Sequence, residues 1–294
     1  MDCYRTPDGA FSGLAGYAFM PHYTDFEGMR MHYVDEGHGD PILLLHGEPT
    51  WSYLYRKMIP LLASTFRVIA PDYLGFGRSD KPLQIADYTY DLHTRSIASL
   101  IETLDLRKAT VVVQDWGGPI GLRVATERKD RFARIVALNT GLFSSSKNWP
   151  TPGFMQWRNF AERVGLDMQV GRVIQASTTS ELDEETLRGY EAPWPVREAR
   201  AGVAAFPLLV PLTPDDPNAA AMLHVMDELR DWEIPALVCW SDGDPVFPPA
   251  AGRAMARLLP GARGEVHEVK GASHMLQEDK GEEIAQRIVD WCSA

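Results

Sequence analysis

The feature that most constrains the fold of this chain is a series of short, almost wholly apolar segments separated by amphipathic stretches. Strands that are buried on both faces of a parallel sheet have this continuous apolar pattern, and the amphipathic stretches are typical of helices that cover the sheet. Alternating strands and helices predict an α/β fold with a doubly wound, mostly parallel sheet. The expected strands are residues 41–46, 66–70, 109–114, 135–139 and 234–240.

One long segment, from about residue 143 to residue 212, interrupts this alternation. It contains no clear strand pattern and is rich in Pro, Trp and helical polar patterns, and strand patterns resume at Ile234. We therefore expect residues 143–212 to form a helical cap, with residues 1–142 and 213–294 forming the core domain. An insertion after the strand at 135–139 lies over the carboxyl edge of the sheet, where ligands bind in folds of this class.

The charge of the chain argues against two classes of partner. The 294 residues carry 29 Lys and Arg against 40 Asp and Glu, which is a formal net charge of −11. A surface this acidic repels the phosphates of nucleic acids and anionic lipids. A small-molecule substrate is therefore the expected partner.

The cysteines and the N-terminal segment bear on location. Cys3, Cys239 and Cys292 lie far apart and have neither the pattern of a disulfide framework nor zinc-site spacing. The first residues lack the basic start and apolar stretch of a signal peptide. No apolar segment approaches the roughly 18 residues that span a bilayer. We therefore expect a cytoplasmic protein.

The sequence VVVQDWGG at residues 111–118 joins an expected strand to an expected helix. Glycines after Asp115 allow the helix to start close against the sheet, and the strained turn projects the Asp115 side chain from the sheet edge. The nucleophile of G-x-S-x-G hydrolases has this placement. An isolated Asp before a helix is more often an N-cap, so the assignment depends on the other motifs.

A second motif, His46-Gly47-Glu48-Pro49, directly follows the strand at 41–46. In this kind of sheet the equivalent loop faces the nucleophile elbow and contributes a backbone N–H to an oxyanion hole. The loop therefore predicts an oxyanion site opposite Asp115.

The acid and the base are expected near the C-terminus. His274 lies at the tip of a loop after a short strand-like run at 265–269, and Asp242 and Asp244 follow the strand at 234–240. By position alone, either carboxylate is able to orient the imidazole. The order nucleophile, acid, histidine along the chain is that of the α/β-hydrolase fold.

Three motifs make a family resemblance specific. The chain resembles the haloalkane dehalogenases in HGEPTW, DYLGFGRSDKP and QDWGG, each at its expected place in the α/β-hydrolase order. The resemblance implies that Asp115 is the nucleophile, that His274 is the base, and that Asp244 is the acid while Asp242 is a turn residue. It covers nearly the whole chain and is weakest in the cap.

The residue types agree with dehalogenation. An aspartate is ionised at pH 7 and attacks an sp³ carbon directly, which gives an alkyl ester and a free halide. His274, held by Asp244, then activates the water that hydrolyses the ester. The backbone N–H groups of Glu48 and Trp116 are the expected oxyanion donors. No metal site or phosphate loop accompanies these residues, so no cofactor is expected.

The halide requires N–H donors in a dry pocket. Trp116 lies beside the nucleophile, and an indole N–H is a donor without an acceptor side. Many family members use an Asn amide at the position of Glu48, but an ionised glutamate is unable to donate and repels an anion. Because the segment GFMQW resembles the start of the first cap helix in the subgroup with Glu after HG, Trp157 is the expected second donor.

The resemblance also implies which apolar residues line the substrate cavity: Phe154, Phe206, Val210, Val246 and Phe247. Two other functions share this fold. Epoxide hydrolases use an elbow Asp but protonate the epoxide with a pair of cap tyrosines, and the segment 143–212 contains only Tyr190. A ligand receptor on a former hydrolase fold does not require Asp115, Asp244 and His274 to be kept. A monomeric hydrolase of short haloalkanes is therefore the expected function.

Overall fold

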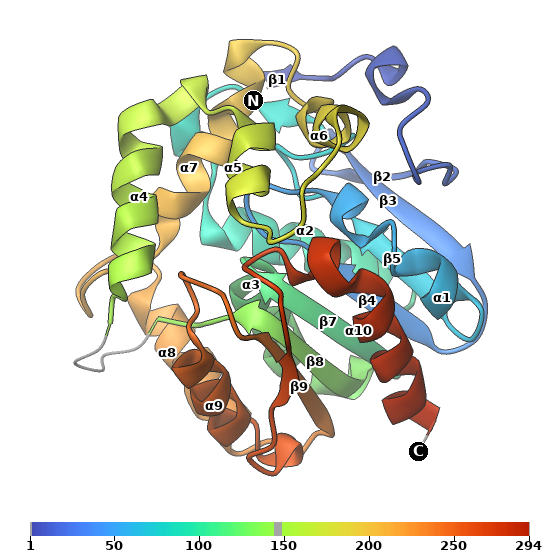
Figure 1. The fold of residues 1–294 in the computed structure, drawn as a ribbon, viewed down its shortest axis with the longest axis vertical. Helices are drawn as coiled ribbons and strands as arrows, with labels where there is room; N and C mark the ends of the chain where they lie inside the picture. Colours follow the sequence, from blue (N-terminus) through green and yellow to red (C-terminus); the bar gives the residue numbers. More distant parts are fainter. Residues whose placement is uncertain (1, 144–148, 294) are drawn as a thin grey trace.

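The computed structural model describes residues 2–143 and 149–293, so positions 144–148 of the expected cap lie outside the described residues. An eight-stranded sheet with the order β10-β9-β8-β7-β4-β5-β3-β2 forms its centre (Figure 1). Neighbours from β10 to β5 are parallel, whereas β3 and β2 are antiparallel. The prediction of an α/β fold with a mostly parallel sheet is confirmed. The strands are β2 (His22–Phe26), β3 (Met29–Gly37), β4 (Pro41–Leu45), β5 (Arg67–Pro71), β7 (Ala109–Asp115), β8 (Phe132–Thr140), β9 (Ala236–Ser241) and β10 (His267–Val269).

The central strands are buried on both faces. Val111, Val112 and Val113 of β7 have no exposed surface, and β7 pairs with β4 on one side and β8 on the other. Side chains on both faces of such a strand need apolar partners, which explains why its sequence is continuously apolar rather than alternating. A separate two-stranded sheet joins β1 (Cys3–Tyr4) to β6 (Lys81–Pro82).

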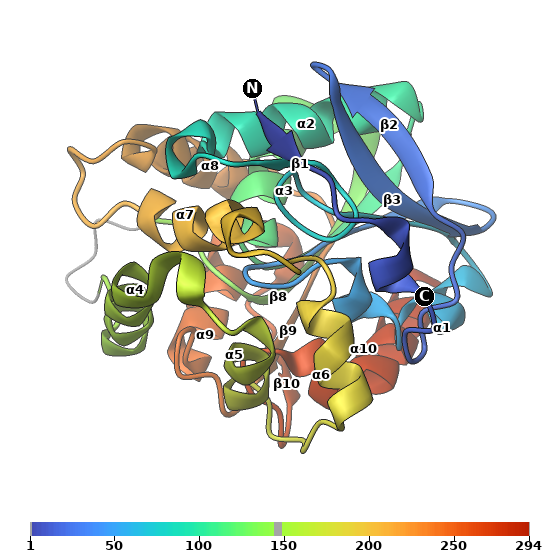
Figure 2. The same cartoon turned by 90° about the horizontal axis from the view of Figure 1, so that it is seen from above.

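Helices cover both faces of the sheet. In Figure 2, α2, α3 and α8 lie on one side and α1 and α10 lie on the other, and contacts join α2 to α3, α3 to α8 and α1 to α10. This arrangement is the double winding that the strand and helix alternation predicts. These helices, with α9 beside β9, are α1 (Ile59–Ala63), α2 (Tyr90–Thr103), α3 (Gly117–Glu127), α8 (Ala219–Arg230), α9 (Pro249–Leu258) and α10 (Leu276–Ser293).

Four further helices lie between β8 and α8 in the sequence: α4 (Pro152–Val164), α5 (Val170–Ala176), α6 (Glu184–Glu191) and α7 (Ala201–Leu209). Figure 1 shows them together beyond one edge of the sheet, and α4 contacts α7 while α5 contacts α6. Thr151 caps α4 by accepting a hydrogen bond from the Phe154 N–H, and Asp183 caps α6 in the same way.

The antiparallel hairpin of β2 and β3 was not predicted. Its strands lie at the edge of the sheet, and β2 is only partly buried, so its sequence lacks the continuous apolar pattern of the centre. Within the described residues, no helix combines the length and the apolar content that a membrane crossing requires.

Candidate active site

Asp115 lies at the last position of β7, where the chain turns into α3. Its φ angle is +48°, a left-handed conformation that non-glycine residues rarely adopt. Surrounding contacts hold this turn: a Cβ on Gly47 would overlap the Asp115 side chain, and one on Gly118 would overlap Thr140. The Thr140 hydroxyl also donates to the Asp115 carbonyl at 2.6 Å. The glycines thus allow the close packing that exposes the carboxylate to the site.

The loop after β4 faces this carboxylate. The backbone N–H of Glu48 donates to Oδ1 of Asp115 at 2.8 Å. The loop is fixed from behind, because the Thr50 hydroxyl donates to the Gly47 carbonyl and His46 hydrogen-bonds the same oxygen. One Asp115 oxygen is therefore held by a backbone donor, as an oxyanion site requires.

His274 lies between two carboxylates. Its Nδ1 atom is 2.8 Å from Oδ2 of Asp244, and its Nε2 atom is 3.7 Å from Oδ2 of Asp115. The other Asp244 oxygen accepts hydrogen bonds from the Val246 and Phe247 N–H groups. The carboxylate is thus fixed on both sides, and it sets the orientation of the imidazole.

Asp242 does not contact the imidazole. It is exposed, and its Oδ1 atom accepts a hydrogen bond from the Gly271 N–H at 2.9 Å. Position along the chain did not decide which of the two carboxylates orients His274. The packing of the loop after β9 decides it, because only Asp244 contacts the imidazole.

The charges of the site are coupled. Burial lowers the pKa of His274, but Asp244 and Asp115 outweigh burial and raise it to about 9. Burial raises the pKa of Asp115, against the opposing effects of His274 and the Glu48 and Trp116 N–H groups. Burial and the nearby Asp115 charge also hold the pKa of the Glu48 carboxyl well above its usual range. Both effects disfavour the ionised form of Glu48.

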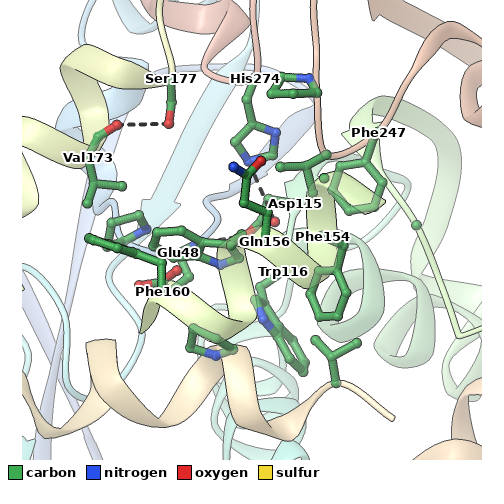
Figure 3. A pocket seen from close by; sticks show the side chains of 18 of the residues that line it. Glu48, Asp115, Trp116, Phe154, Gln156, Phe160, Val173, Ser177, Phe247 and His274 are labelled. Carbon is green, nitrogen blue, oxygen red and sulfur yellow. Dashed lines mark hydrogen bonds and ion pairs between the residues drawn. The ribbon is translucent and has the colours of Figure 1, made fainter. Parts of the chain in front are cut away.

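A cavity of about 590 Å³ opens above these residues. Figure 3 shows Asp115 between Phe154 and Phe247 on one side and Phe160 and Val173 on the other. Its wall is mostly apolar, and its size is typical of a site for a small organic molecule. Of the expected cavity residues, Phe154, Val210, Val246 and Phe247 line it.

The prediction that Phe206 lines the cavity is wrong. It is fully buried and is not among the described residues that line the cavity. Its ring packs edge-on against Trp116, with centroids 5.1 Å apart, and also contacts Phe76 and His93. α7 directs this side chain behind Trp116 rather than into the cavity, so Phe206 supports the indole.

The indoles differ in what their N–H groups bind. Trp149 donates to the Pro211 carbonyl at 3.0 Å, and Trp194 donates to the Gly75 carbonyl at 3.1 Å. Trp116 and Trp157 both line the cavity, and neither indole N–H has an acceptor among residues 2–143 and 149–293. These two donors are therefore free for a guest.

Several cavity residues were not predicted, among them Gln156 and Phe160 of α4, Val173 of α5, and Ser177 directly after α5 (Figure 3). Phe160 lies one helical turn from Trp157, and their rings are 5.8 Å apart. Helical spacing from Trp157 is a signal that points to Phe160. Val173 and Ser177 come from another segment, and no local pattern relates them to the site.

Two features of the described residues bear on epoxide hydrolysis, which needs cap tyrosines, and on metal-dependent chemistry. The Tyr190 hydroxyl is buried and donates to Glu278 at 2.7 Å, and no tyrosine is found among the described residues that line the cavity. The described part of the chain also has no group of three or more His, Cys, Asp or Glu side chains arranged to hold a metal ion.

Comparisons with known proteins show the fold and the family of the chain. The family model for the alpha/beta hydrolase fold matches residues 40–281. A haloalkane dehalogenase from Mycobacterium marinum is 48% identical over 99% of this chain and 100% of its own length. One from Psychrobacter cryohalolentis is 44% identical over 99% of this chain and 98% of its own length.

A solved structure is similar throughout. The tetrameric haloalkane dehalogenase from Paraglaciecola agarilytica superposes with a TM-score of 0.91 at 33% identity, covering 98% of this chain and 97% of that chain. Likeness of this degree over full length extends beyond the shared fold to the family. The chain therefore belongs to the haloalkane dehalogenase family of the alpha/beta hydrolase fold.

Proposed function

We propose that this cavity hydrolyses short haloalkanes to an alcohol, a halide and a proton, with Asp115, Asp244 and His274 as the catalytic residues. The observation that carries the assignment is the placement of His274 between Asp244 and Asp115 at the floor of an apolar cavity. This arrangement provides a nucleophile, a base and an orienting carboxylate in one place.

In the first step, the Asp115 carboxylate attacks the carbon that bears the halogen. A carbon–oxygen bond forms, the carbon–halogen bond breaks, and the halide leaves with the electron pair. The Glu48 N–H holds Oδ1, which leaves Oδ2 free to attack. The apolar wall excludes water, so the carboxylate is weakly solvated and the substrate chain is held by apolar contacts.

In the second step, His274 removes a proton from water, and the resulting hydroxide adds to Cγ of Asp115. The Glu48 and Trp116 N–H groups hold the oxyanion. The bond from Cγ to the alkyl-bearing oxygen then breaks, and the alcohol and a proton leave. Esterification removes the Asp115 charge that helps to raise the pKa of His274, so the imidazole becomes a better proton acceptor when it is needed.

The indole N–H groups of Trp116 and Trp157 are the proposed halide donors. Both tryptophans line the cavity that Asp115 also lines, whereas the Trp149 and Trp194 donors are already bound to carbonyl groups. Hydrogen bonds to an anion are stronger than neutral ones and strengthen as the halide acquires its charge.

The domain roles form part of the proposal: residues 1–142 and 213–294 are the catalytic core, and residues 143–212 are the cap that shapes the cavity. In support, the start of α4 is fixed to the core. The Thr151 hydroxyl donates to the Val246 carbonyl at 3.0 Å, and a Cβ on Gly153 would overlap the Pro245 carbonyl. This contact holds the first turn of α4, the helix that carries Trp157, against the core.

We also propose that the chain acts as a monomer in the cytoplasm. The large apolar side chains that are exposed in the described residues, such as Met20 and Ile85, are few and come from separate segments. Scattered exposure of this kind does not require a partner. The three cysteines are unpaired, as is usual in a reducing compartment. Size-exclusion chromatography with light scattering tests the oligomeric state.

The decisive experiment is to trap the alkyl-enzyme. In a His274→Gln variant, Asp115 still attacks a bromoalkane, but no base activates water. We expect one equivalent of bromide and a stable alkyl adduct on the peptide that contains Asp115, detected by mass spectrometry. His267→Gln is the control, because His267 belongs to β10 outside the cavity and its variant turns over without an adduct. A His274→Gln protein without an adduct contradicts the assignment.

A further inference from the structure

Glu48 contributes two groups to the site, and the mechanism uses only its backbone N–H. Its side chain is 4% exposed and lines the cavity next to Asp115. The Oε1 atom is fully buried and has no hydrogen-bond partner in the described part of the chain. A buried carboxyl oxygen without a partner is rare, since desolvating such a group is costly. The arrangement therefore requires an explanation beyond the loop geometry.

The charges around Glu48 do not favour its ionised form. The ionisable residues that share the cavity wall are Asp115, His274 and Arg163. His274 is hydrogen-bonded to Asp244, and the Arg163 guanidinium lies over the Phe160 ring, 6.0 Å from its centroid. Among the described residues, no ion pair joins Glu48 to a cation. Burial and the Asp115 charge both raise the pKa of Glu48.

We propose that Glu48 works as a neutral carboxylic acid whose O–H donates a hydrogen bond to the halide in the cavity. A protonated carboxyl is a donor, unlike a carboxylate. Oε1 has no exposed surface, so the oxygen of Glu48 that is open to a guest in the cavity is Oε2, for which the described residues also provide no hydrogen bond. A neutral Glu48 also leaves Asp115 as the sole ionised carboxylate among the described residues that line the cavity.

The reaction needs this charge state. Step one exchanges a carboxylate for a neutral ester and a free halide, so one negative charge remains in the cavity throughout. An ionised Glu48 would place a second anion beside that charge in a site with little water, where like charges repel strongly. The inference rests on the proposed function, because the halide is the product of that reaction.

Infrared difference spectroscopy of the intact protein tests the charge state. At neutral pH we expect the C=O stretch of a protonated carboxylic acid in the wild type and its absence in Glu48→Gln. Added bromide should shift this band, because the O–H of the same group binds the anion. A group that served only to support the loop would not respond to bromide.

Bromide affinity, measured by quenching of tryptophan fluorescence, provides the matched comparison. Glu48→Gln keeps an N–H donor of similar length and should weaken bromide binding by less than about 3-fold, whereas Glu48→Met keeps the length without a donor and should weaken it by about 10-fold or more. Thermal melts establish that both variants are folded.

Three outcomes overturn the inference: no acid band at neutral pH, a band that bromide does not move, or equal losses in the two variants. The alkyl adduct of the His274→Gln variant reports separately on the proposed function. If that adduct forms while the acid band is absent, the inference fails and the function stands. If the adduct does not form, the function fails and the inference fails with it.

Discussion

The Nε2 atom of His274 lies 3.7 Å from Oδ2 of Asp115, within ion-pair range but beyond a direct hydrogen bond. The imidazole is thus hydrogen-bonded to Asp244 through Nδ1, while Oδ2 of Asp115 makes no hydrogen bond to it. The two groups interact through charge, so a change at one alters the proton affinity of the other.

This coupling predicts a shift in the His274 titration. Asp115→Asn removes one of the two carboxylates that raise the pKa of His274 to about 9, so the pKa should fall in the variant. Titration of the imidazole by NMR measures the change. An unchanged pKa contradicts the idea that esterification of Asp115 prepares the base.

The same shift predicts how stability depends on pH. Because the pKa of His274 is raised in the folded state, its contribution is fully present below the unfolded pKa of roughly 6.5 and is lost as pH rises through about 9. Over that window, the free energy of unfolding should fall more steeply for the wild type than for His274→Gln. Urea unfolding at a series of pH values makes the comparison, and parallel curves would contradict it.

Trp157→Phe keeps most of the apolar bulk and deletes one free N–H group. Halide affinity and the rate of carbon–halogen cleavage should both fall, by about 1.5 to 3 kcal/mol for a hydrogen bond to an anion. Bromide quenching and single-turnover kinetics measure the two effects. Trp149→Phe and Trp194→Phe are the controls, because their N–H groups bind the Pro211 and Gly75 carbonyls. If a control variant loses more bromide affinity than Trp157→Phe, Trp157 is not the second halide donor.

Gly47→Ala places a methyl group on the Asp115 side chain. The carboxylate must then shift away from its donors, and displacement of a reacting group by about 1 Å costs on the order of 100-fold in rate. Steady-state halide release measures the loss. Gly9→Ala is the matched control, since a Cβ there meets nothing within 4 Å. Equal activity in the two variants would show that the close approach of Gly47 is not required.

The proposed chemistry uses only carboxylate, imidazole and N–H groups of the chain. Turnover should therefore survive dialysis against a chelator. Bromoalkanes should also react faster than matched chloroalkanes when bond cleavage limits the rate, because bromide is the better leaving group. Halide release from paired substrates, with and without chelator, checks both expectations, and loss of activity that added metal restores would refute the first.

The sequence by itself determined the central parallel strands of the sheet, and the order in which the site residues follow them. Continuous apolar runs at 109–114 and 135–139 predicted buried parallel strands, because the periodicity of a strand is a local property that its own residues express. The edge hairpin of β2 and β3 escaped this approach, since its partly exposed positions are not continuously apolar.

Only the tertiary structure decided the environments of individual side chains. It separated Asp244 from Asp242, placed Phe206 behind Trp116, and surrounded Glu48 with apolar groups and Asp115. The tertiary structure also brought Val173 of α5 and Ser177, which follows that helix, to the cavity. Burial, charge coupling and the supply of hydrogen-bond partners depend on segments that are distant in sequence, so no local pattern contains them.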